Sequence, residues 1–116
     1  MSDLAAAAFN EPMALAAITA SELLVGVLRS NTPQRRTRRE AFVEAVLESV
    51  PIMPFDLNVA RVHAGIWAAL VAAGQTIGSN DSMIAATAMA HGYTVLTDNV
   101  RDFNRVPGLE VQQPDW

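Results

Sequence analysis

The chain contains no cysteine and no lysine, and only 17% of its 116 residues are charged. Without cysteine, disulfide bonds and cysteine-based metal sites are excluded. No apolar run is long enough to span a bilayer and no signal-peptide pattern opens the chain, so we expect a cytoplasmic protein that does not enter a membrane. The net charge of −4 argues against a broad basic surface for nucleic acid.

Apolar residues are plentiful, at 51% of the chain, and the length suits one domain over residues 1–116 with a core of its own. Four apolar stretches predict short strands, over residues 13–18, 50–55, 93–97 and 109–112. Helical patterns lie between them, and a further short helix is expected over Leu4–Phe9, capped by Ser2 or Asp3. Such alternation predicts an α/β fold with a parallel sheet covered by helices on both faces.

The most informative residue is Asp81. It lies near the start of a helix that we expect to begin near Asn80 and to stop before Gly92. On that helix Asp81 shares the apolar face with Ile84 and Ala85, and a carboxylate that faces a core is costly unless something pairs with it. The alternative is a structural role, since an acid in the first turn also interacts favourably with the exposed N–H groups and the helix dipole.

Two more acids, Asp98 and Asp102, directly follow the strand predicted over residues 93–97. In open α/β sheets chemistry gathers at the carboxyl ends of strands. Glu22 repeats the arrangement, because we place it in the first turn of a helix that is capped by Thr19 or Ser21. Asp98 and Asp102 could also be ordinary loop residues. The alternative for Glu22 is that it does no more than stabilise the helix through its dipole.

Together these acids offer oxygen ligands alone, which suit Mg²⁺ or Mn²⁺. A divalent ion held by carboxylates can bind a phosphate oxygen and activate a water, so metal-dependent phosphodiester hydrolysis is the leading enzyme class. No Ser-His-Asp pattern, phosphate-binding glycine loop or dinucleotide fingerprint competes with it. His63 and His91 fit no metal-ligand spacing, and we interpret both as structural or surface residues.

A run of arginines, Arg35, Arg36, Arg38 and Arg39, precedes glutamates at helical spacing. The usual explanation is a solvated helix face with ion pairs to Glu40, Glu44 and Glu48. The alternative is a patch that contacts phosphates at the mouth of a site.

Two motifs resemble those of the PIN-domain toxins of bacterial toxin–antitoxin pairs, the VapC-like ribonucleases. They read A-I-T-A-S-E-L-L-V-G, around Glu22, and I-G-S-N-D-S-M-I-A-A-T-A-M-A-H-G-Y-T-V-L-T-D-N-V-R-D-F. The resemblance implies a three-layer α/β/α domain, Mg²⁺-dependent endoribonuclease activity on structured RNA such as tRNA or rRNA, inhibition by a cognate antitoxin, and a homodimer.

Carried over by position, the resemblance implies that Glu22, Asp81 and Asp102 are the catalytic, metal-binding acids. Asp98 is a further candidate ligand. The supporting polar positions are Thr97, Asn99 and Asn80, and the RNA-binding candidates are Arg35, Arg36, Arg38 and Arg39.

The start of the chain departs from the family pattern. The family opens with an apolar strand that ends in an acidic metal ligand, whereas this chain reads M-S-D-L-A-A-A-A-F. We therefore expect that strand and its acid to be absent, with the chain truncated at its N-terminus relative to the family. Asp3 is a poor substitute, because no apolar strand precedes it. This favours a second hypothesis, a PIN-like module that binds antitoxin or a partner protomer without catalysis.

Overall fold

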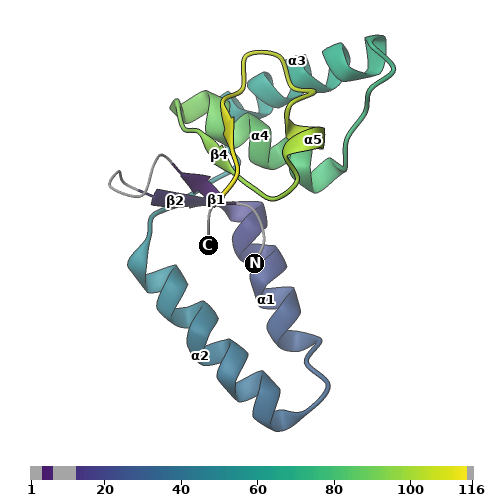
Figure 1. Ribbon diagram of the computed structural model, residues 1–116. Helices are drawn as coiled ribbons and strands as arrows, with labels where there is room; N and C mark the ends of the chain where they lie inside the picture. The colour runs from purple at the N-terminus through teal and green to yellow at the C-terminus, as the bar shows by residue number, and fades with distance from the viewer. Residues whose placement is uncertain (1–3, 7–12, 115–116) are drawn as a thin grey trace.

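The computed structural model describes residues 4–6 and 13–114, and it shows helices on both faces of a small sheet (Figure 1). The strands are β1 (Leu4–Ala6), β2 (Met13–Ala16), β3 (Ile52–Met53), β4 (Val95–Leu96) and β5 (Val111–Gln112). The helices are α1 (Ala17–Leu28), α2 (Pro33–Ser49), α3 (Leu57–Ala72), α4 (Ser79–His91) and α5 (Val100–Phe103). The predicted α/β class is confirmed. None of the described helices is both long and apolar enough to cross a bilayer.

The strand order of the sheet is β3-β2-β1-β4-β5. The outer pairs are parallel as predicted, since β2 pairs with β3 and β4 with β5 in the same direction. The middle strand β1 is antiparallel to both β2 and β4. Because β2 and β4 both oppose β1, they run in the same direction, and their carboxyl ends open on the same edge of the sheet.

The helix predicted over Leu4–Phe9 is wrong for Leu4–Ala6, which forms β1. Ala5 of β1 lies opposite Ala14 on one side and Val95 on the other. A strand at this place forms hydrogen bonds with the backbone N–H and C=O groups of β2 on one side and of β4 on the other. This gain outweighs the helix propensity of an alanine run. The strand carries no acidic residue, while residues 7–9 and the capping candidates Ser2 and Asp3 lie outside the described residues.

Successive side chains of the strands point to opposite faces of the sheet and pack into two separate cores. Ala16 and Val95 belong to the larger core, with residues of α3, α4 and α5. Their neighbours Leu15 and Leu96 belong to a smaller cluster on the opposite face, with residues of α1 and α2. This period of two produces the three layers expected of the fold.

The predicted end of α4 at Gly92 is confirmed, and a side-chain cap marks the start of α3. Asp56 caps α3 by accepting a 3.0 Å hydrogen bond from the Val59 backbone N–H, and Gly92 ends α4 with φ +71°. The prediction for α1 is wrong, because that helix begins at Ala17 without a side-chain cap. Thr19 is instead fully buried inside the helix.

Two phenylalanines offer a matched test of this packing. Phe103 is 0% exposed and anchors α5, whereas Phe42 on α2 is 54% exposed. We expect Phe103→Ala to lower the free energy of unfolding by about 3–5 kcal/mol. Phe42→Ala should lower it by less than about 1 kcal/mol, because little buried surface is lost. Urea denaturation measures both, and equal losses would contradict the assignment of Phe103 to the core.

Candidate active site

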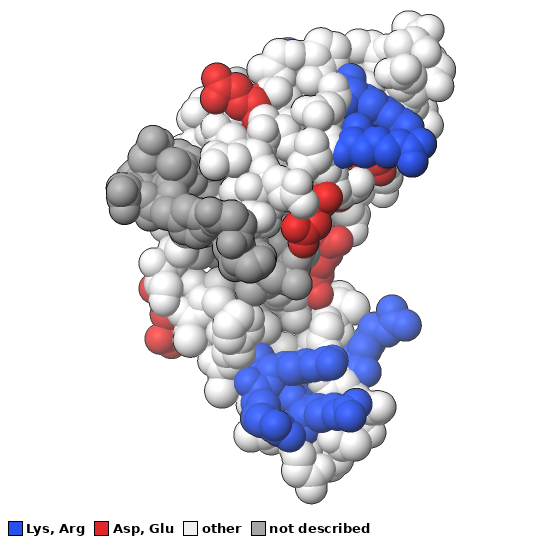
Figure 2. Space-filling view, in the orientation of Figure 1, with Lys and Arg blue, Asp and Glu red and all other residues white. Residues whose placement is uncertain are grey.

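Acidic side chains line a hollow between the α1–α2 hairpin and the body formed by the other helices, with arginine side chains on both sides of it (Figure 2). The hollow lies beside the edge of the sheet where β2 and β4 end. The chain after β2 forms α1, which carries Glu22, and the chain after β4 carries Asp98 and Asp102. The topology therefore brings together acids that are far apart in the sequence.

Asp81 and Asp102 are joined by one amide group. The Asn99 Nδ2 donates to Asp81 Oδ2 at 3.2 Å and to Asp102 Oδ2 at 3.1 Å. Both carboxylates are half-buried, where their mutual repulsion is screened less than at an open surface. The Asn99 amide, with its partial positive charge, offsets that repulsion, which gives this predicted supporting residue a defined structural role.

The loop after β4 is shaped by Thr97. This residue is 2% exposed, and its Oγ1 accepts a 2.9 Å hydrogen bond from the Asn99 backbone N–H. The turn directs Asn99 towards α4, while Asp98 is exposed. Of the two acids that the sequence left as alternatives, Asp102 lies in the hydrogen-bonded cluster.

Glu22 reaches the same region from α1. Its Oε2 accepts a 3.3 Å hydrogen bond from Asn80 Nδ2, and Asn80 is the residue directly before Asp81. The sequence placed Glu22 in the first helical turn, which is wrong because α1 begins at Ala17. Glu22 thus lies one turn further along the helix, beyond the residues whose N–H groups attract acids most strongly.

A buried contact fixes the start of α4 beside Asp81. The Ser82 hydroxyl donates to the Ser79 carbonyl at 2.7 Å, and His63 Nε2 lies 3.0 Å from the same hydroxyl oxygen. Since the hydroxyl proton is already used, His63 Nε2 is the donor in this contact. The structural interpretation of His63 fits this role, whereas His91 is exposed at the last turn of α4.

Sequence reasoning missed Arg105. Its Nη1 lies 3.7 Å from Asp102 Oδ1 and donates to the Thr76 carbonyl at 3.1 Å. This side chain ties α5 to the segment before α4. The spacing of three residues from Asp102 was the available signal in the sequence.

The donor types here fit Mg²⁺ or Mn²⁺, since they are carboxylate and amide oxygens. Within the described ranges, however, no three His, Cys, Asp or Glu side chains converge closely enough to hold an ion. Amide donors lie against the acids where a cation would bind, with Asn99 between Asp81 and Asp102. Among the described residues, the buried Thr19 Oγ1 has no hydrogen-bond partner, and it lies on α1 one turn before Glu22. The residues therefore have suitable chemistry but do not form a closed metal site.

The arginine run does not form the predicted ion pairs. In the described part of the chain no salt bridge joins these arginines to the glutamates of α2. Arg39 instead reaches α1, where its Nη1 donates at 3.4 Å to the Gly26 carbonyl and to Ser30 Oγ. Arg39 and Glu22 line the same groove between α1 and α2, so the last arginine of the run borders the acidic region.

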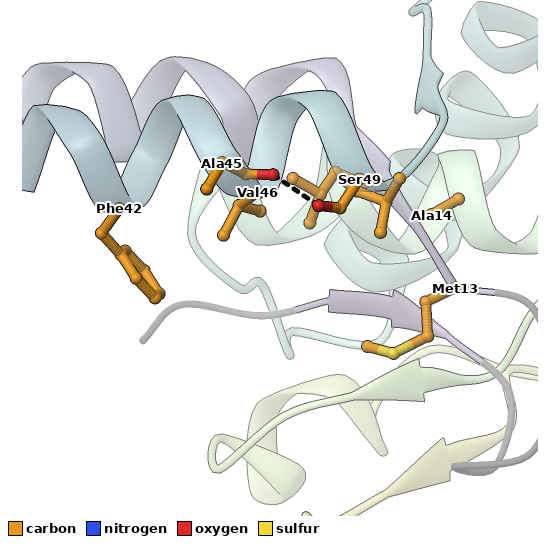
Figure 3. A pocket seen from close by; sticks show the side chains of 8 residues that line it. Met13, Ala14, Phe42, Ala45, Val46 and Ser49 are labelled. Carbon is orange, nitrogen blue, oxygen red and sulfur yellow. Dashed lines mark hydrogen bonds between the residues drawn. The ribbon is translucent and has the colours of Figure 1, made fainter.

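A second cavity, of about 280 Å³, lies between α2 and β2 (Figure 3). Met13, Leu15, Phe42 and Val46 supply its apolar lining. Its one side-chain hydroxyl, on Ser49, already donates to the Ala45 carbonyl at 2.6 Å. None of its described lining residues is ionisable, so they offer no acid–base or metal chemistry.

The sequence model of the PIN domain matches residues 2–109. The chain belongs to the PIN-domain family. It is 45% identical over 94 residues to Ribonuclease VapC1 of Rickettsia felis, covering 81% of this chain and 70% of that protein. It is 35% identical over 105 residues to the tRNA(fMet)-specific endonuclease VapC of Salmonella typhimurium, covering 90% and 75%.

The fold agrees with solved structures of this family. The crystal structure of VapBC2 from Rickettsia felis, bound to a DNA fragment from their promoter, aligns with a TM-score of 0.83 and 27% identity. The alignment covers 91% of this chain and 77% of that one. The resemblance stated from the motifs is thus confirmed at the level of family and fold, and this PIN-domain chain is a VapC-type protein.

The amide between the two carboxylates can be tested by a near-isosteric change. Asn99→Asp removes the donor and adds a third negative charge, so we expect the free energy of unfolding to fall by about 2 kcal/mol. Asn104→Asp, at the exposed end of the same α5 helix, should change it by less than about 0.5 kcal/mol. Chemical denaturation at low ionic strength compares the two, and an equal effect would show that Asn99 does not offset the carboxylates.

Proposed function

We propose that this PIN-domain protein is the toxin of a toxin–antitoxin pair and acts in the cytoplasm as an Mg²⁺- or Mn²⁺-dependent endoribonuclease. The observation that carries the proposal is that Glu22, Asp81 and Asp102, from three helices, are linked through asparagine hydrogen bonds at one edge of the sheet. The names of its relatives support the reaction class, since they are ribonucleases, and one is a tRNA(fMet)-specific endonuclease. A structured RNA such as tRNA or rRNA is the proposed substrate.

In this proposal Asp81 and Asp102 hold the ion, with Glu22 at the side of α1. When bound, the ion supplies charge neutralisation at the scissile phosphate and a more acidic water. Asn99 orients the two carboxylates before the ion arrives, and Thr97 fixes the turn that carries Asn99. Arg105 keeps Asp102 in place through its contact with the Thr76 carbonyl.

A second candidate function is supported by the open arrangement of the acids. Because no closed metal cluster forms among the described residues, the chain could act as a binding module that captures an antitoxin or a partner protomer without cutting RNA. Solved relatives are VapBC complexes, which supports an antitoxin partner for this protein as well.

We further propose that the protein forms a homodimer through one face of α3. Ala64, Trp67, Ala68 and Val71 follow helical spacing on this face and are all exposed. Trp67 is stacked on His63, with ring centroids 6.2 Å apart, which holds its large apolar surface in one orientation. A rigid aromatic side chain of this kind is typical of an interface centre.

Metal binding is tested by thermal unfolding with and without Mg²⁺ or Mn²⁺. At about 100 times its dissociation constant an ion that binds only the folded state stabilises it by about 2.7 kcal/mol. We expect this gain in the wild type and in Asp98→Asn, because Asp98 lies outside the cluster. Asp81→Asn and Asp102→Asn should lose it.

The same four proteins are then assayed for RNA cleavage with and without metal. Cleavage by the wild type and Asp98→Asn alone supports the ribonuclease. If neither metal stabilisation nor cleavage is found in the wild type, the binding module is the better account.

The dimer is tested by sedimentation of Trp67→Asp. A charge at the centre of an apolar interface cannot be desolvated without a partner, so we expect this variant to sediment as a monomer. The control is Leu28→Asp, because Leu28 lies at the end of α1 and its side chain is 64% exposed. This variant should leave the dimer intact. A wild type that is monomeric at all concentrations would refute the proposed interface.

A further inference from the structure

The groove between α1 and α2 contains features that the proposed chemistry does not use. Its volume is about 480 Å³, within the range of pockets that hold small ligands. Glu22 lies at its side, so the groove adjoins the acidic cluster, and Arg39 and Phe42 form part of its α2 wall. Resting on the ribonuclease proposal, we propose that this groove binds one unpaired nucleotide of the RNA next to the scissile phosphate. Its base stacks on Phe42 and its phosphate contacts Arg39.

The charges on α2 favour a nucleotide over an apolar peptide. Arg35, Arg38, Arg39 and Phe42 are spaced by three or four residues and so share one face of the helix. The three arginines together line a hollow of their own, which shares Arg39 with the groove. A column of guanidinium groups beside an exposed aromatic ring matches the phosphate backbone and base of single-stranded RNA.

Phe42 has the exposure that a stacking platform needs. It is 54% exposed, whereas Val43 beside it is 4% exposed and belongs to the packing of the hairpin. Apolar spacing in the sequence groups Phe42 with Val43, Val46 and Leu47 on a buried side of α2, which is wrong for Phe42. Phe42 also lines the apolar cavity between α2 and β2, so its ring borders both hollows and is not enclosed by the core.

Gly26 is the second, independent observation. It lies in α1 on the wall of the groove, about one turn after Glu22, and a Cβ built there would meet no atom within 4 Å. Its φ is not in the left-handed region, so neither backbone conformation nor close packing requires glycine here. Glycine is costly in a helix relative to alanine. We infer that its missing side chain leaves room for the nucleotide.

If Gly26 leaves room for a nucleotide, replacing it by alanine should raise stability and lower RNA affinity. Gly26→Ala should raise the melting temperature by about 2–4 °C, because alanine favours the helix. It should also weaken binding of single-stranded RNA several-fold, because the methyl group occupies the groove. Gly65→Ala on α3 is the matched control, since its added Cβ also meets nothing within 4 Å. It should raise the melting temperature similarly and leave RNA affinity unchanged.

The test uses fluorescence anisotropy with a labelled, mixed-sequence RNA of about 12 nucleotides, a length that fits the site sizes of single-strand binders. The RNA is used single-stranded or annealed to its complement, with EDTA present to prevent metal-dependent cleavage. Phe42→Ala should weaken single-stranded binding about tenfold, and Phe42→Trp should retain it, since stacking needs an aromatic face. Duplex binding should change by less than about twofold, because paired bases cannot enter the groove.

The outcomes separate this inference from the ribonuclease proposal. If the wild type cuts and binds RNA but Phe42→Ala and Gly26→Ala bind it unchanged, the nucleotide site is overturned and the ribonuclease stands. If these variants lose affinity for an antitoxin peptide alone, the groove is a protein-docking site and the inference is wrong. A wild type that neither binds nor cuts RNA overturns both proposals.

Discussion

The burial of α4 between the sheet and α3 is the constraint on which the rest of the structure depends. Ile84, Ala85, Ala86 and Ala88 are all 0% exposed, so this helix is enclosed on nearly every side. Small side chains allow its backbone to approach its neighbours closely, and the His63–Ser82 hydrogen bond fixes its first turn. The position of Asp81, one residue before Ser82, therefore follows from core packing, and the site is as rigid as the core beneath it.

Electrostatic balance at the sheet edge is the second requirement. Bringing half-buried acids together costs free energy, and this chain offsets the cost with neutral amides from Asn80 and Asn99. The same amides define a resting arrangement that a divalent ion would have to displace. Under the proposed function, an ion would have to move two asparagine side chains from the acids, which is why metal stabilisation is the test that discriminates between the two proposals.

The α1–α2 hairpin extends the site away from the sheet (Figure 1). It carries the arginine run, Phe42 and Gly26, and Glu22 links it to the acidic cluster. Under the two proposals, chemistry and substrate selection reside on different layers of the fold. Changes in the proposed nucleotide groove would then alter RNA binding without disturbing the core that positions Asp81, which is a common advantage of placing recognition on a protruding element.

The sequence by itself determined the α/β class, the strand at Met13–Ala16, the end of α4 at Gly92, and the family, because these depend on local periodicity, capping chemistry and motifs. Tertiary structure alone decided the rest. Leu4–Ala6 became a strand because two neighbouring strands needed a partner, against its local helix propensity. Asp102 rather than Asp98 joined the acids because a buried Thr97 turned the loop. Phe42 is exposed and Arg39 borders Glu22 because α2 packs on α1 through Val43, a rotation about the helix axis that apolar spacing alone does not fix.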